Sequence, residues 1–211
     1  MSSRPRTNMS SPALARVIEL VVHRGTQRVL DGVSETLCQG EVVVIMGENG
    51  SGKTTLIEAF AGLIPLRSGD VIWAENGNSI VVRDSQGRRN QPPSMGLTLQ
   101  KGGVCGDETV MERISVSLSV AGIEHSDDQI MELLSLWGLE HRANDRLAHL
   151  SGGLSRRVAI LGGLAPAALS NSPLVVLLDE PSEGLDDSAK DILSSWIRSS
   201  YLGYPWRSRL I

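Results

Sequence analysis

One short segment constrains the fold of this 211-residue chain more than any other: Gly-Glu-Asn-Gly-Ser-Gly-Lys-Thr at 47–54. Its glycines let backbone N–H groups converge on phosphate oxygens, and its lysine and threonine open a helix. An apolar run at 41–46 precedes it, and residues 54–62 with helical spacing follow. The run predicts a strand buried on both faces of a parallel sheet. Strand, glycine loop and helix together predict a nucleotide-phosphate site, in which Lys53 reaches the β- and γ-phosphates and Thr54 holds Mg²⁺.

A second apolar run ends in acid. Leu174–Leu178 leads directly into Asp179, Glu180 and Pro181. Two carboxylates at the carboxyl end of a parallel strand lie where ligands bind in open α/β sheets. One of them can support Mg²⁺ and the other can orient water. Alone, this sequence is a common turn, but beside a phosphate loop it favours nucleotide hydrolysis.

A third segment, Leu-Ser-Gly-Gly-Leu at 150–154, precedes a predicted helix that runs to Leu164, before Pro166. Ser151 is the expected N-cap, and the N–H groups of Gly152 and Gly153 could meet an anion. In isolation, a capped helix start is the simpler interpretation. A second anion site needs an explanation, because the phosphate loop already binds the nucleotide.

Composition excludes several classes of protein. With 41% apolar and 21% charged residues the chain can bury a core, and a wholly disordered protein is excluded. Four Trp, two Tyr and one Phe offer little surface for base stacking, and the net charge is −4, so nucleic acid is not an expected partner. Cys38 and Cys105 lack metal-site spacing, and no apolar stretch approaches the ~18 residues of a membrane span, which favours the cytoplasm.

The order of predicted elements indicates an α/β fold. We expect a disordered tail at 1–12 and a single domain at 13–211. Strands at 13–22 and 29–37 form an antiparallel edge, and helical patterns at 110–120 and 129–139 form a helical subdomain at about 104–150. Further strands are expected at 95–99 and 174–178, and a last helix at about 188–199.

In this order and at these separations, the phosphate loop, LSGGL at 150–154, LLDEP at 177–181 and SEGLD at 182–186 resemble the ATP-binding cassette (ABC) ATPases over roughly residues 13–200. The resemblance implies a P-loop NTPase fold of the ABC ATPase type, with a mostly parallel core sheet, an antiparallel β edge and a helical subdomain. It implies ATP and Mg²⁺ as cofactors. It also implies that two cassettes pack head to tail, so that Ser151 and Gly153 meet the γ-phosphate held by the partner.

The resemblance assigns roles by matching position. Glu180 polarises the attacking water, Gln100 senses Mg²⁺ and water, and Asp186 communicates across the dimer. Catalysis is thus assigned to Glu180, Lys53 and Gln100, and Mg²⁺ ligation to Thr54, Gln100 and Asp179. The implied nucleotide contacts are Gly47, Glu48, Asn49, Gly50, Ser51, Gly52, Lys53, Thr54, Thr55, Ser151, Gly152, Gly153 and Asp186.

By this resemblance the chain is the ATP-hydrolysing subunit of an ABC membrane transporter, peripheral on the inner face of the cell membrane. Its partners are a second ABC ATPase subunit and a membrane-spanning subunit. Three departures stand out: His23 and Arg24 where the family stacks adenine on an aromatic, Leu154 in place of Gln, and no histidine after His149 to act as the family's switch. The absent histidine favours one alternative, an ATP-binding dimerisation or regulatory module with little turnover. A soluble non-transport ABC ATPase is a second alternative.

Overall fold

The computed structural model describes residues 11–75, 77–100, 106–172 and 174–198. These fall into two compact units, one up to Pro93 and the other from Ser94 onward. Residues 1–10 of the expected tail lie outside the described residues, as does Cys105, and the Pro12 carbonyl accepts a hydrogen bond from the Gln39 amide. A single domain over 13–211 stays a prediction.

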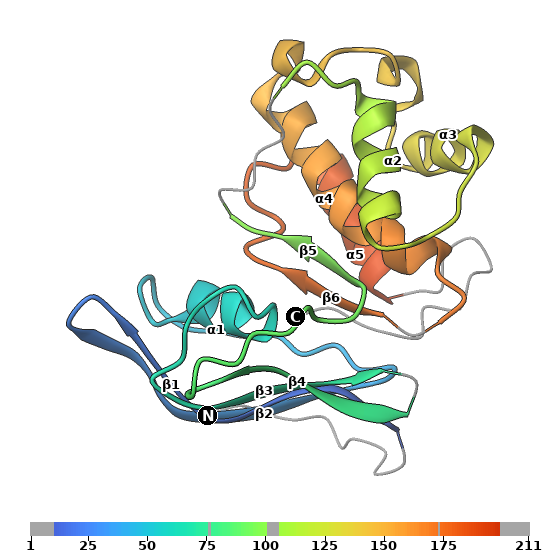
Figure 1. Ribbon diagram of the computed structural model, residues 1–211. Coiled ribbons are helices and arrows are strands. Elements are labelled where there is room, and N and C mark those ends of the chain that lie inside the picture. Colours follow the sequence, from blue (N-terminus) through green and yellow to red (C-terminus); the bar gives the residue numbers. More distant parts are fainter. Residues whose placement is uncertain (1–10, 76, 101–105, 173, 199–211) are drawn as a thin grey trace. The chain divides into compact units, whose positions relative to one another are not determined.

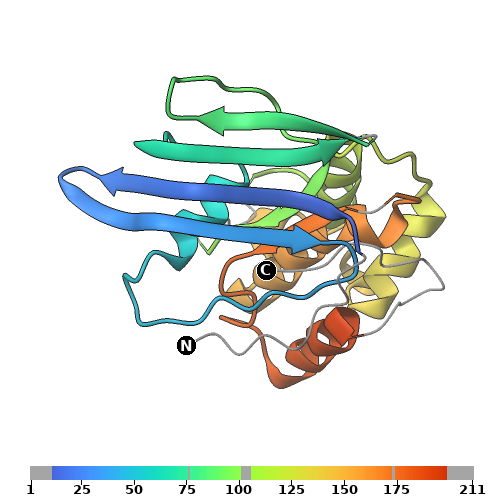
Figure 2. The same cartoon turned by 90° about the horizontal axis from the view of Figure 1, so that it is seen from below.

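An antiparallel sheet dominates the first unit. Its four strands lie in the order β2-β1-β3-β4, which Figure 2 shows side by side. The predicted antiparallel edge is confirmed, since β1 and β2 pair from Ala13↔Cys38 to Arg24↔Gln27. Helix α1 contacts β1 and β2, and buried Trp73 donates its ring N–H to the Phe60 carbonyl at 2.8 Å. The bounds are β1 Ala13–Arg24, β2 Gln27–Cys38, α1 Lys53–Phe60, β3 Ser68–Glu75 and β4 Asn78–Asp84.

The apolar run at 41–46 does not form the strand that its sequence predicts. It has no regular secondary structure, and Val44 and Met46 are 73% and 88% exposed. A strand that is apolar on both faces needs sheet neighbours and covering layers. The antiparallel sheet of this unit has β2 and β4 at its edges, and the run joins neither. The prediction rested on hydrophobicity alone and did not consider a pairing partner. The expectation of a buried strand is wrong for this structure.

The second unit is built on a parallel strand pair. Strand β5 (Met95–Thr98) pairs with β6 (Val175–Leu178) from Met95↔Val175 to Thr98↔Leu178, which confirms the strands expected at 95–99 and 174–178. Helix α4 (Gly152–Leu169) packs on both strands, and α2 (Val110–Val120) packs on α4 (Figure 1). Every residue of β6 is buried. Among the described residues this pair is the parallel sheet, and the four-stranded sheet of the first unit is antiparallel.

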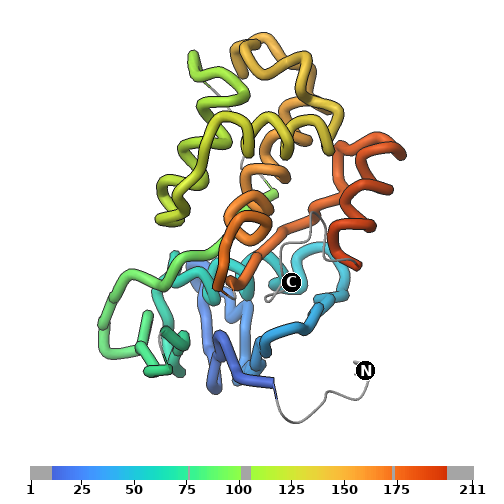
Figure 3. Tube along the Cα trace, turned by 90° about the vertical axis from the view of Figure 1, so that its right-hand side faces the viewer, coloured from blue at the N-terminus to red at the C-terminus, as the bar shows by residue number. Residues whose placement is uncertain are grey.

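The predicted helical region between these strands contains α2, α3 (Asp127–Leu136) and two short 3₁₀ turns, Glu140–Arg142 and Leu147–His149. Figure 3 shows α2 in light green, α3 in yellow and α4 in orange. Thr109 and Ser126 begin the two helices with capping boxes completed by Glu112 and Gln129. Helix α3 ends three residues earlier than the expected 139, before Gly138 at φ +64°.

Helix α4 continues through Pro166 to Leu169, whereas the sequence predicted an end at Leu164. Proline inside a helix forfeits one backbone hydrogen bond and crowds the preceding turn. The residues from Gly163 to Leu169 are nevertheless all buried. Burial of this apolar turn offsets the lost hydrogen bond, so tertiary packing overrides the local stop signal.

Helix α5 (Asp187–Arg198) follows and closes the described chain, matching the helix expected at about 188–199. Its Trp196 meets Trp137 edge to face, with ring centroids 5.7 Å apart. Among the described residues, no helix is both long and apolar enough to cross a membrane.

Candidate functional site

The phosphate loop belongs to the first unit and has the backbone that its glycines permit. Gly50 and Gly52 have φ values of +81° and +97°, which side chains of L-residues rarely adopt. A Cβ at Gly47 would lie 2.5 Å from the Ser51 hydroxyl oxygen. The Lys53 ammonium donates to the carbonyls of Gly47 and Glu48, each at 2.9 Å. The lysine is therefore folded back onto the loop that the sequence predicts to hold phosphate.

Helix α1 begins at this loop without a side-chain cap. Its N-cap, Gly52, has no capping side chain, and its first turn has no acidic residue. The N–H groups of a helix start and the dipole behind them attract an anion. Thr54 lies in this first turn, and Thr55 beside it is buried at 7% exposure. An anion bound here would supply the missing cap.

The turn between β1 and β2 contacts the same helix. Arg24 forms an ion pair with Glu58 of α1, and His23 next to it is exposed. The sequence singled out His23 and Arg24 as the residues present where the family has an aromatic side chain. It did not foresee that a carboxylate would engage the Arg24 guanidinium. Glu58 lies five residues after Lys53 in α1, and helical spacing alone does not predict that its ion-pair partner lies in the turn between β1 and β2.

The second unit brings together several of the predicted catalytic residues. Gln100 follows β5, and Asp179 and Glu180 follow β6, so parallel pairing places them at one edge of the strand pair. The Gln100 amide nitrogen donates to Glu180 at 2.8 Å and to Glu183 at 3.2 Å. Asp179 is 1% exposed, whereas Glu180 is half-buried. The contact between Gln100 and Glu180 joins two residues 80 positions apart.

The sequence missed Glu183, which lies exposed in the loop that follows Glu180. Its carboxylate shares the Gln100 amide with Glu180. Both N–H groups of that amide thus face carboxylates, which leaves the amide oxygen as the side chain's other polar atom. The third acid in Asp-Glu-Pro-Ser-Glu was visible in the sequence, but its spacing alone does not show that it reaches a glutamine from another strand.

Ser151 begins α4 as predicted. Its hydroxyl accepts a hydrogen bond from the Leu154 amide at 3.4 Å. Gly152 and Gly153 are exposed, and a Cβ at Gly152 would meet nothing within 4 Å. The first turn of this helix is therefore open around two glycines, and it contains no acidic residue.

Asp186 is tied to its own unit. Arg157 donates to both of its carboxylate oxygens, one at 2.6 Å, and the Ala189 amide donates to it at 2.9 Å. Hydrogen bonding to Arg157, followed by the Ala189 amide, lowers the pKa of Asp186 below its ordinary value of 3.8. The Arg157 guanidinium also reaches the Trp137 carbonyl at 3.2 Å. Asp186 thus caps α5 and links it to α4.

Sequence reasoning also missed Arg156 and Arg157. Two adjacent arginines near the start of α4 oppose the helix dipole, which favours negative charge there. That mismatch is a signal that the pair has partners elsewhere. The structure supplies them: Asp186 for Arg157, and a group of backbone carbonyls for Arg156.

The side chains present fit a magnesium ion. Mg²⁺ takes hard oxygen ligands, commonly one or two carboxylates together with substrate phosphates. Asp179 offers a buried carboxylate, and the orientation of the Gln100 amide offers its oxygen. Within the described ranges no three His, Cys, Asp or Glu side chains gather as a metal cage. A site of this kind would therefore take its remaining ligands from phosphate and water.

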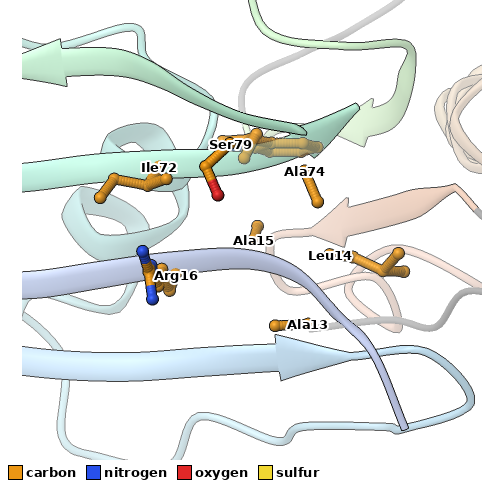
Figure 4. A pocket seen from close by; sticks show the side chains of 8 residues that line it. Ala13, Leu14, Ala15, Arg16, Ile72, Ala74 and Ser79 are labelled. Carbon is orange, nitrogen blue, oxygen red and sulfur yellow. The ribbon is translucent and has the colours of Figure 1, made fainter. Parts of the chain in front are cut away.

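A pocket on the antiparallel sheet is too small for a nucleotide. It has a volume of about 80 Å³ and is lined by residues of β1, β3 and β4, including Ala15, Arg16, Ile72 and Ser79 (Figure 4). Ligand pockets usually measure about 300–1,000 Å³. The phosphate loop lies outside this lining, so we assign the pocket no role.

Comparisons with known proteins agree with the resemblance that these residues carry. The family model described as ABC transporter matches residues 30–183. A solved ATP-binding subunit of an ABC transporter is 26% identical, with a TM-score of 0.72 over 87% of this chain and 72% of its own. An ABC transporter ATP-binding protein from Pyrococcus furiosus is 23% identical, with a TM-score of 0.71 over 93% and 89%. An ATP-binding cassette in its ADP conformation is 22% identical, with a TM-score of 0.68 over 95% and 81%.

The family match covers more than two thirds of the chain and includes the phosphate loop, the LSGGL segment, Gln100 and the acidic pair after β6. The structural matches extend the likeness to the fold, and the P-loop ABC ATPase type is thereby confirmed. The chain belongs to the ABC transporter family.

Proposed function

We propose that this chain is the ATP-binding and ATP-hydrolysing subunit of an ABC membrane transporter. The observation that carries the proposal is the hydrogen bond from Gln100 to Glu180 at the carboxyl ends of β5 and β6. A glutamate held by an amide beside a buried aspartate is the arrangement that phosphoryl transfer to water needs, because the chemistry depends on positioning and charge. The phosphate loop in the same chain binds the nucleotide.

Lys53 and the start of α1 bind the phosphates of ATP in this proposal, with Gly47–Gly52, Thr54 and Thr55 forming the remainder of the cradle. Thr54, Asp179 and Gln100 would hold Mg²⁺, and the bound ion would neutralise charge on the phosphates. Glu180 orients the attacking water, and Gln100 keeps the Glu180 carboxylate in place. The products are ADP and phosphate.

A second ABC ATPase subunit completes the proposed site. The exposed glycines after Ser151 offer N–H groups to a γ-phosphate held by that partner, which explains a second anion site in the chain. Closure on ATP and reopening after hydrolysis would drive a membrane-spanning partner subunit. The chain would then lie peripherally at the inner face of the cell membrane. A mostly parallel core sheet is also part of this proposal.

The test is Glu180→Gln, which removes the charge and keeps the shape. We expect phosphate release to stop while ATP-dependent dimerisation persists, and Lys53→Ala to lose binding of a fluorescent ATP analogue. Glu124→Gln changes an exposed glutamate and serves as the matched control. Unchanged hydrolysis in Glu180→Gln would refute the catalytic role. Wild-type protein that dimerises on ATP without releasing phosphate would favour a regulatory module instead.

A further inference from the structure

One arginine connects three segments of the second unit. Arg156, in the second turn of α4, donates to the residues that follow β5, to the residues that follow β6, and to the turn before α5. Among the described residues, every acceptor of these hydrogen bonds is a backbone carbonyl. They are Glu183 at 3.1 Å from Nε, Leu99 at 3.3 Å and Gln100 at 3.4 Å from Nη1, and Asp179 at 3.2 Å and Glu180 at 2.9 Å from Nη2.

These contacts use the whole guanidinium. Arginine has five N–H donors in a rigid fork, one on Nε and two on each Nη, and the five contacts divide in that proportion. Lysine has three donors on a flexible stem and cannot reproduce them. Because Arg156 is half-buried, its charged hydrogen bonds are less exposed to competing water.

Among the residues that Arg156 contacts, Glu180 has the most constrained backbone. Its φ of +46° lies in the left-handed region, which is strained for a non-glycine residue and persists only when surrounding contacts hold it. Its carbonyl accepts the shortest of the Arg156 hydrogen bonds, and its carboxylate accepts from Gln100. The Gln100 carbonyl is itself an Arg156 acceptor. Arg156 therefore holds both residues of the Gln100 and Glu180 contact by their backbones.

We propose that Arg156 is a positioning residue for hydrolysis, which fixes Glu180 and Gln100 relative to the helix that begins at Ser151. The inference rests on the proposed function and adds a residue to it. Ser151 and Arg156 share the first turns of α4, so a phosphate bound at the helix start and the glutamate that orients water are linked through one rigid element. Arg156 does not touch the substrate in this role.

The test compares Arg156→Lys and Arg156→Met with Arg142→Met. Arg142 is an arginine of the same unit whose exposed ion pair with Asp145 contributes little to stability. Phosphate release is measured against ATP concentration, and kcat is counted per nucleotide-binding site, so that unfolded molecules do not lower it. Urea unfolding of each variant is measured in parallel.

We expect kcat to fall about 100-fold in Arg156→Met, because a displacement of about 1 Å at a catalytic group has an effect of that order. Arg156→Lys keeps the charge and some donors and should fall about tenfold. KM for ATP should stay within about threefold in both, since the phosphate-binding residues are intact. Adding Gln100→Ala to Arg156→Met should lower kcat no further than the more damaging single change, because both act through Glu180.

Several outcomes would overturn the inference. Wild-type kcat in Arg156→Lys and Arg156→Met, or fully multiplicative effects with Gln100→Ala, refute a positioning role even if ATP hydrolysis itself is established. A parallel rise in KM with constant kcat would assign Arg156 to nucleotide binding. If the wild-type chain binds no ATP, or binds it without hydrolysis, the proposed function and this inference fail together. If Arg156→Met does not fold, Arg156→Lys decides alone.

Discussion

Replacing Gly163 with alanine tests the packing that holds β5 against α4. A methyl carbon at this position would lie 2.1 Å from the Thr98 hydroxyl oxygen and 3.3 Å from the Leu97 carbonyl. The Thr98 hydroxyl donates to the Ala159 carbonyl at 3.2 Å in a buried environment. It must therefore abandon that hydrogen bond, or α4 must move away from the strand. Gln100 lies two residues past Thr98, so the displacement would reach the site.

The magnitude follows from three contributions. Leaving a buried polar group without its partner costs about 1–3 kcal/mol. Overpacking a tight contact costs about 1–3 kcal/mol. Replacing a helical glycine by alanine returns about 1 kcal/mol through helix propensity. The net expectation is a loss of about 3 kcal/mol in the free energy of unfolding.

Gly162→Ala is the matched control. It receives the same gain in helix propensity, and its methyl carbon would lie at the looser distance of 3.0 Å from the hydroxyl oxygen of Ser117, a half-buried side chain that donates to the Arg113 carbonyl. Urea unfolding followed by tryptophan fluorescence measures both variants. Gly163→Ala should be less stable than Gly162→Ala by about 3 kcal/mol, and Thr98→Ala should relieve part of that difference by removing the obstructing hydroxyl. Equal stability of the two glycine variants would refute the close approach of α4 and β5.

Three further predictions concern the rest of the chain. The lowered pKa of Asp186 stabilises the folded state above the ordinary pKa, near 3.8, and that stability is lost as the pH falls through the pKa of the folded state. In urea titrations, Asp186→Asn should therefore be destabilising at pH 7 and much less so at pH 3. An equal effect at both pH values would contradict the ion pair. Trp137 has a buried ring N–H without a hydrogen-bond partner among the described atoms, so Trp137→Phe should change the unfolding free energy by less than about 1 kcal/mol, against about 3–5 kcal/mol for Trp137→Ala in the same assay. Arg24→Met breaks an exposed ion pair and should cost less than about 1 kcal/mol in urea unfolding, while any weakening of ATP-analogue binding would place Arg24 at the nucleotide.

Local sequence signals predicted most elements of the second unit. Capping residues, glycine at helix ends and apolar periodicity each depend on a few neighbouring residues, and α2 has the same bounds as its predicted pattern, 110–120. The run at 41–46 shows where this reasoning stops. Its apolar residues predict a buried strand, but whether a strand forms depends on a pairing partner supplied by distant chain. Pro166 shows the converse, since a buried surface kept a helix going past its local stop signal.

The candidate site divides in the same way. Local sequence patterns identified four features, because the residues that mark each of them are adjacent in the chain. They are the phosphate loop, Ser151, Asp179 and Glu180. Arg156 was not, because its partners are backbone carbonyls, which every residue carries and no sequence pattern marks. A side chain that binds the backbone of three segments leaves no complementary side chain to recognise. An arginine that opposes a helix dipole is the remaining signal of such a role.

The three acids after β6 lie in different surroundings, and these surroundings suit them to different roles. Asp179 is buried at the strand end, Glu180 is half-buried and held by Gln100, and Glu183 is exposed. Gln100 can donate only two N–H bonds from its amide, and Glu180 and Glu183 accept both. The amide therefore cannot turn over without leaving two carboxylates unpaired and bringing its oxygen against their charge. Glu183 thus fixes the direction of the Gln100 oxygen, and in the proposed function it is Glu180 that orients the water.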